Sequence, residues 1–201
     1  MNILPLLSLM AFMIYMHLGL HTYHLDPKSR LNRMLLVVCL DLSWWAFSYS
    51  FVYSAPNMEM LWFWFKMSSI GWCFFGGITL HFLLVLSQKD RWLRKWWIYG
   101  LLYGAGLIFT VRAWTGVLTA KDFIKAPLGW VELGAPESPW FWLHFINYSA
   151  CILLGCFLAF QWGNRSKTLR EKKQGYIIGG TILAAFILGS LINVAIPALH
   201  K

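Results

Sequence analysis

The sequence predicts an all-α integral membrane protein, a single domain formed by a bundle of six transmembrane helices with its amino terminus outside. Hydrophobic residues make up 59% of the 201 residues and charged residues only 12%, and the mean hydropathy is +0.57. A water-soluble globule needs more polar surface than this composition supplies. The net charge of +9 does not indicate a nucleic-acid partner, because the basic residues form short clusters between apolar runs, as membrane topology signals do.

The first three apolar runs predict transmembrane helices at about residues 2–22, 34–54 and 60–87. The first run has no basic start, and no small-residue cleavage site follows it, which indicates a retained helix and not a signal peptide. A polar loop with Asp26-Pro27 separates it from the second run, and the short turn SAPNME separates the second from the third.

The run 60–87 is expected to be the central helix of the bundle. It is about 42 Å long as a helix, which is enough to cross a bilayer with some tilt. At about 100° per residue, several of its polar and small side chains share one stripe. The stripe consists of Lys66, Ser69, Cys73, Gly77 and His81. A helix surrounded by lipid would not keep these residues on one face, so we expect the stripe to face other helices.

The last three apolar runs predict spans at about 96–111, 140–162 and 175–196. A basic loop, QKDRWLRK, precedes the first of them, and another, NRSKTLREKK, precedes the last. The segment 112–139 contains Gly, Pro and both charge signs, and it is expected to be a longer loop.

The placement of Lys and Arg predicts the orientation of these spans. Twelve basic residues fall in the loops on one side, four fall on the other, and Lys66 stays within the membrane. The larger group, which is expected to be cytoplasmic, is Lys28, Arg30, Arg33, Lys89, Arg91, Arg94, Lys95, Arg165, Lys167, Arg170, Lys172 and Lys173. The smaller group is Arg112, Lys121, Lys125 and Lys201. Both termini are therefore predicted to lie outside.

Residues 30–87 form a pattern that carries a family resemblance. It runs from the basic RLNR through the Trp44-Trp45 pair and FSYSFVYSA to WFWFKMSSIGWCFFGGITLHFLLVLS. The later basic loops, the longer loop with Trp and Gly, and the aromatic fifth span agree with it. The chain resembles the seven-helix amino-terminal sensory region found on some bacterial histidine kinases and diguanylate cyclases.

This resemblance implies a receptor in the bacterial cytoplasmic membrane that acts on a cytoplasmic signalling domain, in cis or in trans. The sequence departs from it in having six predicted spans instead of seven. No phosphoacceptor His box, ATP-binding Gly-rich loop or GGDEF motif is found, so no enzymatic activity is expected of these residues. The resemblance carries over no defined set of ligand-binding residues.

Two ionisable residues lie within the predicted spans on the cytoplasmic side. Asp41 and His81 are expected at matching depths, roughly 10 Å and 9 Å from that edge, on antiparallel neighbouring helices. Burying such groups in hydrocarbon is costly, so we predict that they pair. The pair is either a structural clasp between two helices or a switch that senses protons or conformation.

A second polar group lies toward the outside, and it predicts a ligand pocket. The candidate residues are Lys66, Ser69, His144, Asn147 and Asn193. Facing helices with small residues and a few polar groups would form a concave site for a small amphipathic or anionic ligand, with Lys66 as the counter-charge. The alternative is that Lys66 reaches the lipid headgroups and His144 is an interface residue.

Other chemistry has little support in the sequence. The four cysteines have no metal-binding spacing, and GxSxG, HExxH and phosphate-binding loops are missing, so no metal or cofactor is expected. His17 and His81 leave open a membrane cytochrome, because both approach the cytoplasmic side.

The function predicted from the sequence is a sensory membrane domain. Its partners would be a small-molecule ligand, membrane lipids and a cytoplasmic signalling module. A homodimer suits such a receptor, although no residue indicates one. The leading alternative is a six-helix substrate-binding subunit of a transporter, against which stands the lack of an internal repeat.

Overall fold

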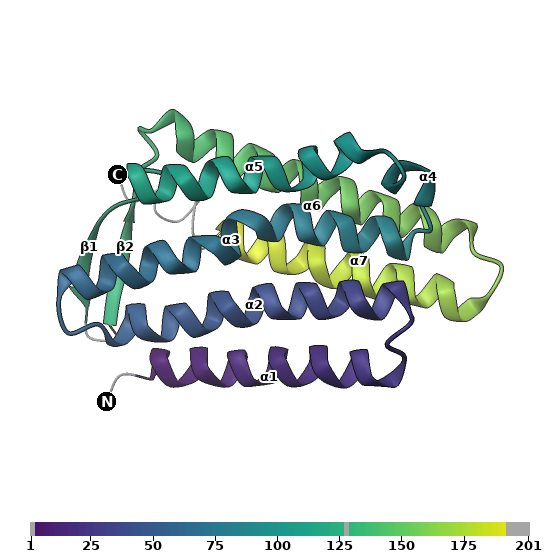
Figure 1. Cartoon of the computed structure of the whole chain (residues 1–201), viewed down its shortest axis with the longest axis horizontal. Helices are drawn as coiled ribbons and strands as arrows, with labels where there is room; N and C mark the ends of the chain where they lie inside the picture. The colour runs from purple at the N-terminus through teal and green to yellow at the C-terminus, as the bar shows by residue number, and fades with distance from the viewer. Residues whose placement is uncertain (1–2, 127–128, 192–201) are drawn as a thin grey trace.

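The computed structural model describes residues 3–126 and 129–191 as seven α-helices and one two-stranded hairpin (Figure 1). Six of the helices have 20 or more residues. The helices are α1 (Leu4–Leu25), α2 (Arg30–Ser54), α3 (Met58–Leu86), α4 (Asp90–Leu93), α5 (Trp96–Thr115), α6 (Pro139–Arg165) and α7 (Leu169–Ser190). The strands are β1 (Ala120–Ala126) and β2 (Gly129–Gly134).

Three of the long helices, α2, α3 and α7, begin at polar residues whose side chains cap them. The Ser29 hydroxyl accepts a hydrogen bond from the Asn32 backbone N–H at the start of α2, and the Asn57 side chain accepts one from Met60 N–H at the start of α3. Such caps satisfy backbone groups that have no partner within the helix. Because the caps lie in the polar loops, both helices start before the apolar runs from which their spans were predicted.

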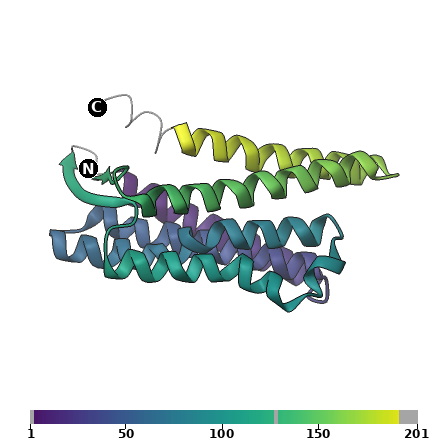
Figure 2. The same ribbon diagram turned by 90° about the horizontal axis from the view of Figure 1, so that it is seen from above.

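Helix α3 lies at the centre of the bundle and packs against α2, α5 and α6. Helix α1 packs on α2, and α7 packs on α6 (Figure 2). Most of the residues of α3 along its apolar stretch are buried, whereas very few residues of α1 are. The expected central position of this helix is therefore present in the structure.

The described part of each predicted span coincides with one of the six long helices, while residues 192–196 of the last predicted span lie outside the described residues. Of these, α1, α2, α3 and α6 are long and apolar enough to cross a membrane by length and composition. Helix α5 has 20 residues but contains several Gly and Tyr residues, and α7 starts with the charged LREKK. The number of membrane spans and the side on which the amino terminus lies remain predictions.

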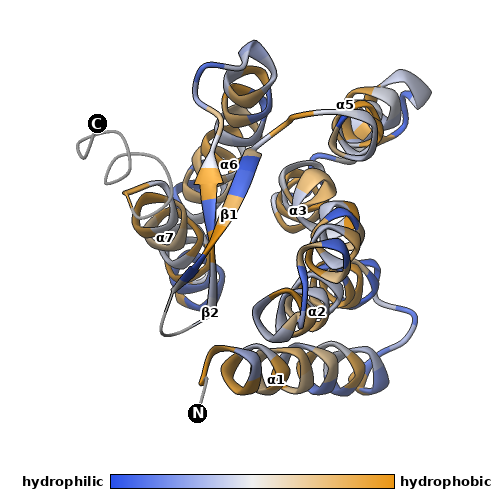
Figure 3. Ribbon diagram, turned by 90° about the vertical axis from the view of Figure 1, so that its left-hand side faces the viewer, coloured by the Kyte–Doolittle hydropathy of each residue, from blue (hydrophilic) through white to orange (hydrophobic). Residues whose placement is uncertain are grey.

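The predicted loop 112–139 contains strands, which corrects the sequence interpretation. Strands β1 and β2 are antiparallel, with Phe123 opposite Glu132, and the register is irregular between Ala120 and Asp122. This irregularity lets Ala120 and Phe123, three residues apart, both be buried. Seen from the end in Figure 3, the hairpin lies across the bundle beside α2, α3 and α6.

The two ends of the bundle differ in charge, and we name them accordingly. The hairpin end holds the start of α1, the turn at residues 55–57 and the hairpin (Figure 1). The basic end holds the connections between α1 and α2, between α3 and α5, and between α6 and α7. All twelve basic residues predicted to be cytoplasmic lie at or near the basic end.

Candidate functional site

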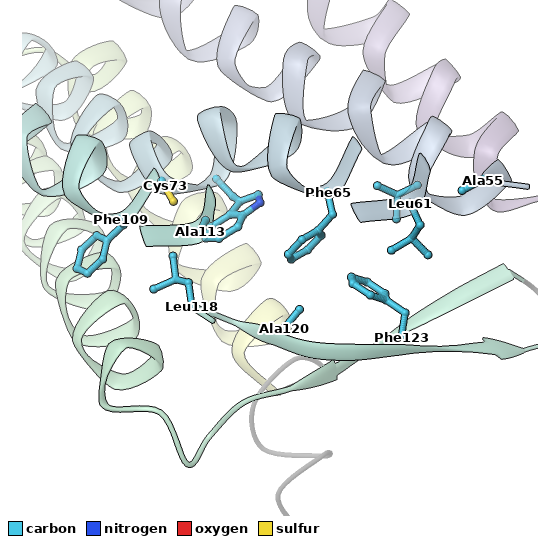
Figure 4. Packing of buried hydrophobic residues seen from close by; sticks show 11 residues of the cluster. Ala55, Leu61, Phe65, Cys73, Phe109, Ala113, Leu118, Ala120 and Phe123 are labelled. Atoms are coloured by element: carbon cyan, nitrogen blue, oxygen red, sulfur yellow. The ribbon is translucent and has the colours of Figure 1, made fainter. Parts of the chain in front are cut away.

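One apolar core joins the hairpin to the helices at the hairpin end. It draws on α2, α3, α5 and the hairpin segment, as the inward-pointing side chains of Figure 4 show. Its buried members are Val52, Ala55, Leu61, Phe65, Trp72, Cys73, Phe109, Ala113, Leu118, Ala120 and Phe123. Because these side chains exclude water together, moving the hairpin must also disturb the ends of α2, α3 and α5.

Two aromatic residues of the hairpin hold it on the helices. The ring of Phe123 meets the rings of Trp62 and Phe65 edge-on, each at a centroid distance of 5.1 Å. The Trp130 indole Nε1 donates a hydrogen bond to the Ala55 carbonyl oxygen at 2.9 Å. Aromatic edge contacts and satisfied indole groups favour one defined position of the hairpin.

Lys66 and Ser69 lie where α3 meets α5. The Trp114 indole Nε1 of α5 donates to the Lys66 carbonyl oxygen at 2.9 Å and to the Ser69 hydroxyl at 3.2 Å. Ser69 is fully buried, and its hydroxyl donates to the same Lys66 carbonyl at 2.6 Å. These contacts involve the backbone carbonyl of Lys66 and not its ammonium group. The role of that ammonium group as the counter-charge of a ligand stays a prediction.

His144 lies among aromatic rings where α3, α5 and α6 meet. Its ring meets Trp72 of α3 and Phe109 of α5 edge-on, each at 5.2 Å, and lies parallel to Tyr148 one turn along α6. The Trp72 indole in turn donates to the Ser68 hydroxyl at 3.1 Å. His144 is therefore a half-buried residue packed between three helices.

The predicted ligand residues are brought together only in part. Among the described residues, no hydrogen bond or ring contact joins Lys66 or Ser69 to His144. Asn147 is half-buried on α6, close to His144 in the chain. Asn193 lies outside the described residues.

A comparison with protein families identifies the chain. Residues 6–199 match the family described as the N-terminal 7TM region of histidine kinase. The chain belongs to this family. No curated protein and no solved structure matches it significantly.

Membership in the 7TM region family confirms the resemblance that residues 30–87 carry, and with it an all-α, multi-pass membrane protein. A 7TM region of this kind is the membrane sensory part of a histidine kinase and not its catalytic part.

The predicted pairing of Asp41 with His81 is not present in the structure. His81 Nδ1 forms a hydrogen bond of 2.6 Å with the Tyr103 hydroxyl of α5. Within the described part of the chain, the buried atoms Asp41 Oδ2 and His81 Nε2 have no hydrogen-bond partner. His81 therefore joins α3 to α5 by a hydrogen bond, and it does not join α3 to α2.

The register of α2 against α3 explains this correction. The turn at residues 55–57 is tight, so residues of α2 and α3 that are equally far from it in sequence lie side by side. Asp41 precedes Ala55 by the same number of residues by which Gly71 follows Asn57, so Asp41 is expected beside Gly71. The Asp41 carbonyl oxygen accordingly lies 3.2 Å from where a Cβ of Gly71 would be. His81 is ten residues, about 15 Å of helix, further along. The predicted depths of Asp41 and His81 were wrong because they were counted from the predicted ends of the two spans and not from the turn that connects the helices.

The structure does not support the cytochrome alternative. His17 is exposed on α1, where it stacks on His21, whereas His81 is buried on α3, and α2 packs against both helices. The two imidazoles therefore cannot ligate one iron. Within residues 3–126 and 129–191, no group of three or more His, Cys, Asp or Glu side chains could hold a metal ion.

Sequence reasoning missed one charged residue at the hairpin end. Glu132 of β2 is half-buried, and burial raises the pKa of its carboxyl to about 7, although the nearby Thr119 hydroxyl acts in the opposite direction. In the sequence, Glu132 is only one of several charged residues of the predicted loop 112–139, and nothing in that pattern indicates that a hairpin buries it.

Proposed function

We propose that the chain senses a small ligand or signal in its outer half and passes a conformational change to a cytoplasmic signalling output. The observation that carries this proposal is the shared core at the hairpin end, in which Phe123 packs against Phe65 of the central helix. A ligand that shifts the hairpin or enters this core would favour a different position of α3.

The packing of α3 offers a route for this change to the basic end. Three of its glycines lie close to three neighbouring helices: Gly71 to Trp45 of α2, Gly76 to Tyr148 and Cys151 of α6, and Gly77 to Leu102 of α5. Close backbone packing of this kind has few intermediate positions, so a shift at one end is passed along as a rigid movement.

The charge distribution supports an orientation with the hairpin end outside. The basic end carries the excess of Lys and Arg, which in membrane proteins marks the cytoplasmic side. Exposed tryptophans at this end, including Trp92, Trp96 and Trp97, suit a membrane–water interface. We place the chain in the bacterial cytoplasmic membrane with its amino terminus outside.

The ligand residues proposed from the sequence are Lys66, Ser69, His144, Asn147 and Asn193. The aromatic surroundings of His144 suit an amphipathic ligand, since Trp72 and Phe109 provide ring faces and the imidazole provides a polar atom. The signalling partner would be a histidine kinase output domain in the same protein, as the family description implies.

Kinase activity in native membranes tests this proposal. In membranes from cells expressing the complete gene product, Phe123→Ala should change histidine autophosphorylation severalfold, because it removes the contact with Phe65. Ile124→Ala, at a half-exposed position on the same strand, is the matched control and should have no effect. An unchanged activity in Phe123→Ala would overturn the proposed role of the hairpin core.

The intact mass of the protein in its native membrane is the complementary measurement. A mass well above 23.3 kDa would show an output domain in the same chain, as a receptor requires. A mass of 23.3 kDa would contradict this arrangement and favour the transport-subunit alternative.

A further inference from the structure

A hollow of about 300 Å³ opens at the basic end, where α3 ends and α6 turns into α7. It lies at the low end of the size range of ligand sites, which suits a small head group. Its lining residues are Gln88, Trp162, Arg165, Ser166, Lys167 and Glu171. We propose that this hollow binds the phosphate of an anionic phospholipid head group.

Two cations of the hollow are available to a ligand. Within the described residues, Arg165 and Lys167 form no ion pair with a carboxylate. A guanidinium and an ammonium that line the same hollow suit a phosphate, which accepts bidentate hydrogen bonds from Arg and is attracted by the point charge of Lys.

The one acidic residue of the hollow is engaged elsewhere. The Glu171 carboxylate Oε2 accepts a hydrogen bond of 2.9 Å from the Thr168 hydroxyl, which itself accepts the Glu171 backbone N–H. This reciprocal cap ties Glu171 to the first turn of α7. Its charge lowers the positive potential of the hollow but does not cancel two cations.

The rim of the hollow is continuous with the end of α3. Gln88 there has a φ of 55°, a left-handed conformation that is uncommon outside glycine. The next residue, Lys89, is half-buried, and its ammonium donates to Gln161 of α6 at 3.3 Å. A third cation therefore lies close to the hollow, between α3 and α6.

The position of the hollow favours a lipid over a free anion. Trp162, which lines it, and the exposed Trp92, Trp96 and Trp97 belong to the same end of the bundle, where tryptophan marks the depth of the lipid head groups. Basic pockets between transmembrane helices on the cytoplasmic side bind anionic head groups in other proteins. A lipid bound here would connect the end of α3 to the α6–α7 connection.

Native mass spectrometry of the intact protein, released from membranes with phosphatidylglycerol or phosphatidylcholine, tests the proposal. Wild type should retain phosphatidylglycerol in preference to phosphatidylcholine. The double variant Arg165→Gln/Lys167→Gln should bind phosphatidylglycerol about 30-fold more weakly, given the contribution of each basic side chain near an anionic leaflet. The control Arg91→Gln/Arg94→Gln removes the same charge from exposed positions at the α4 connection and should retain the lipid.

Three results would overturn the proposal. The first is unchanged binding in the Arg165/Lys167 variant, and the second is an equal loss in both double variants, which would show only general attraction to surface charge. The third is displacement of phosphatidylglycerol by inorganic phosphate, which would make the free anion the ligand. The single variant Arg165→Lys, tested in the same way, keeps the charge and should retain more of the binding than the Arg165→Gln/Lys167→Gln variant. An unchanged melting temperature in the double variants would show that the bundle is folded.

Discussion

Gly77 of α3 lies against the carbonyl oxygen of Leu102 in α5, and a Cβ at this position would overlap that oxygen. The obstacle is backbone, which cannot rotate away as a flexible side chain can. The close approach therefore requires glycine, and any larger residue must separate the central helix from α5.

We expect Gly77→Ala to lower the free energy of unfolding in detergent by about 1–3 kcal/mol, the usual cost of overpacking. Gly104→Ala is the matched control, because a Cβ at Gly104 meets nothing within 4 Å. It should be neutral or slightly stabilising, since alanine favours the helix more than glycine. Equal melting temperatures for the two variants would contradict this packing.

The hairpin should become less stable as the pH rises. The Glu132 carboxyl has a pKa of about 7, compared with an ordinary value of 4.5, because burial disfavours its charge. The folded state therefore holds a proton that the unfolded state releases between these pH values. The stabilisation is fully present below about pH 4.5 and is lost as the pH rises through about 7. The loss should be roughly 1–3 kcal/mol.

Hydrogen exchange of the β1 and β2 amides at about pH 5 and pH 8 measures this effect, once the intrinsic pH dependence of exchange is subtracted. Glu132→Gln should remove it. Glu137→Gln is the control, because Glu137 is exposed and its ion pair with Lys121 contributes little. If Glu132→Gln and wild type have the same pH dependence, burial of this carboxyl has no effect on the hairpin.

The hydrogen bond between His81 and Tyr103 should appear as an energetic coupling. In a double-mutant cycle with His81→Leu and Tyr103→Phe, we expect a coupling of about 0.5–3 kcal/mol, because the two groups are in direct contact. A second cycle with His81→Leu and Asp41→Asn should be additive within about 0.5 kcal/mol. The reverse pattern would support the pair predicted from the sequence.

The helices could be predicted because their apolar runs are long and separated by polar or basic loops, so that composition alone locates them. The polar residues that determine the ends, such as Ser29 and Asn57, lie in the loops and lengthen α2 and α3 beyond the apolar runs. The strands were missed because KDFIKAPLGWVELG has little alternation, and the irregular register at Ala120 and Asp122 disturbs it further.

The candidate site could be predicted less well, because it depends on contacts between helices. A helical stripe shows that Ser69 faces another helix, but it does not show that the partner is Trp114 of α5. His144 was recognised as polar within an apolar run, yet its neighbours Trp72 and Phe109 come from distant segments. The short turn at residues 55–57 determines the register of α2 against α3. Counting residues from this turn would have shown that Asp41 and His81 are too far apart to pair.

The hydrogen bond from Trp130 to the Ala55 carbonyl joins the hairpin to the end of α2. Trp130→Phe keeps an aromatic ring but removes the donor to the Ala55 carbonyl, which should cost about 1 kcal/mol. The hairpin amides should then exchange about fivefold faster, because they open locally without unfolding of the bundle. Val131→Ala, at an exposed position on the same strand, should leave the rates unchanged. If Trp130→Phe instead lowers the stability of the whole bundle without accelerating local exchange, the hairpin amides open only when the bundle unfolds, and the bond to Ala55 does not stabilise the hairpin separately from the helices.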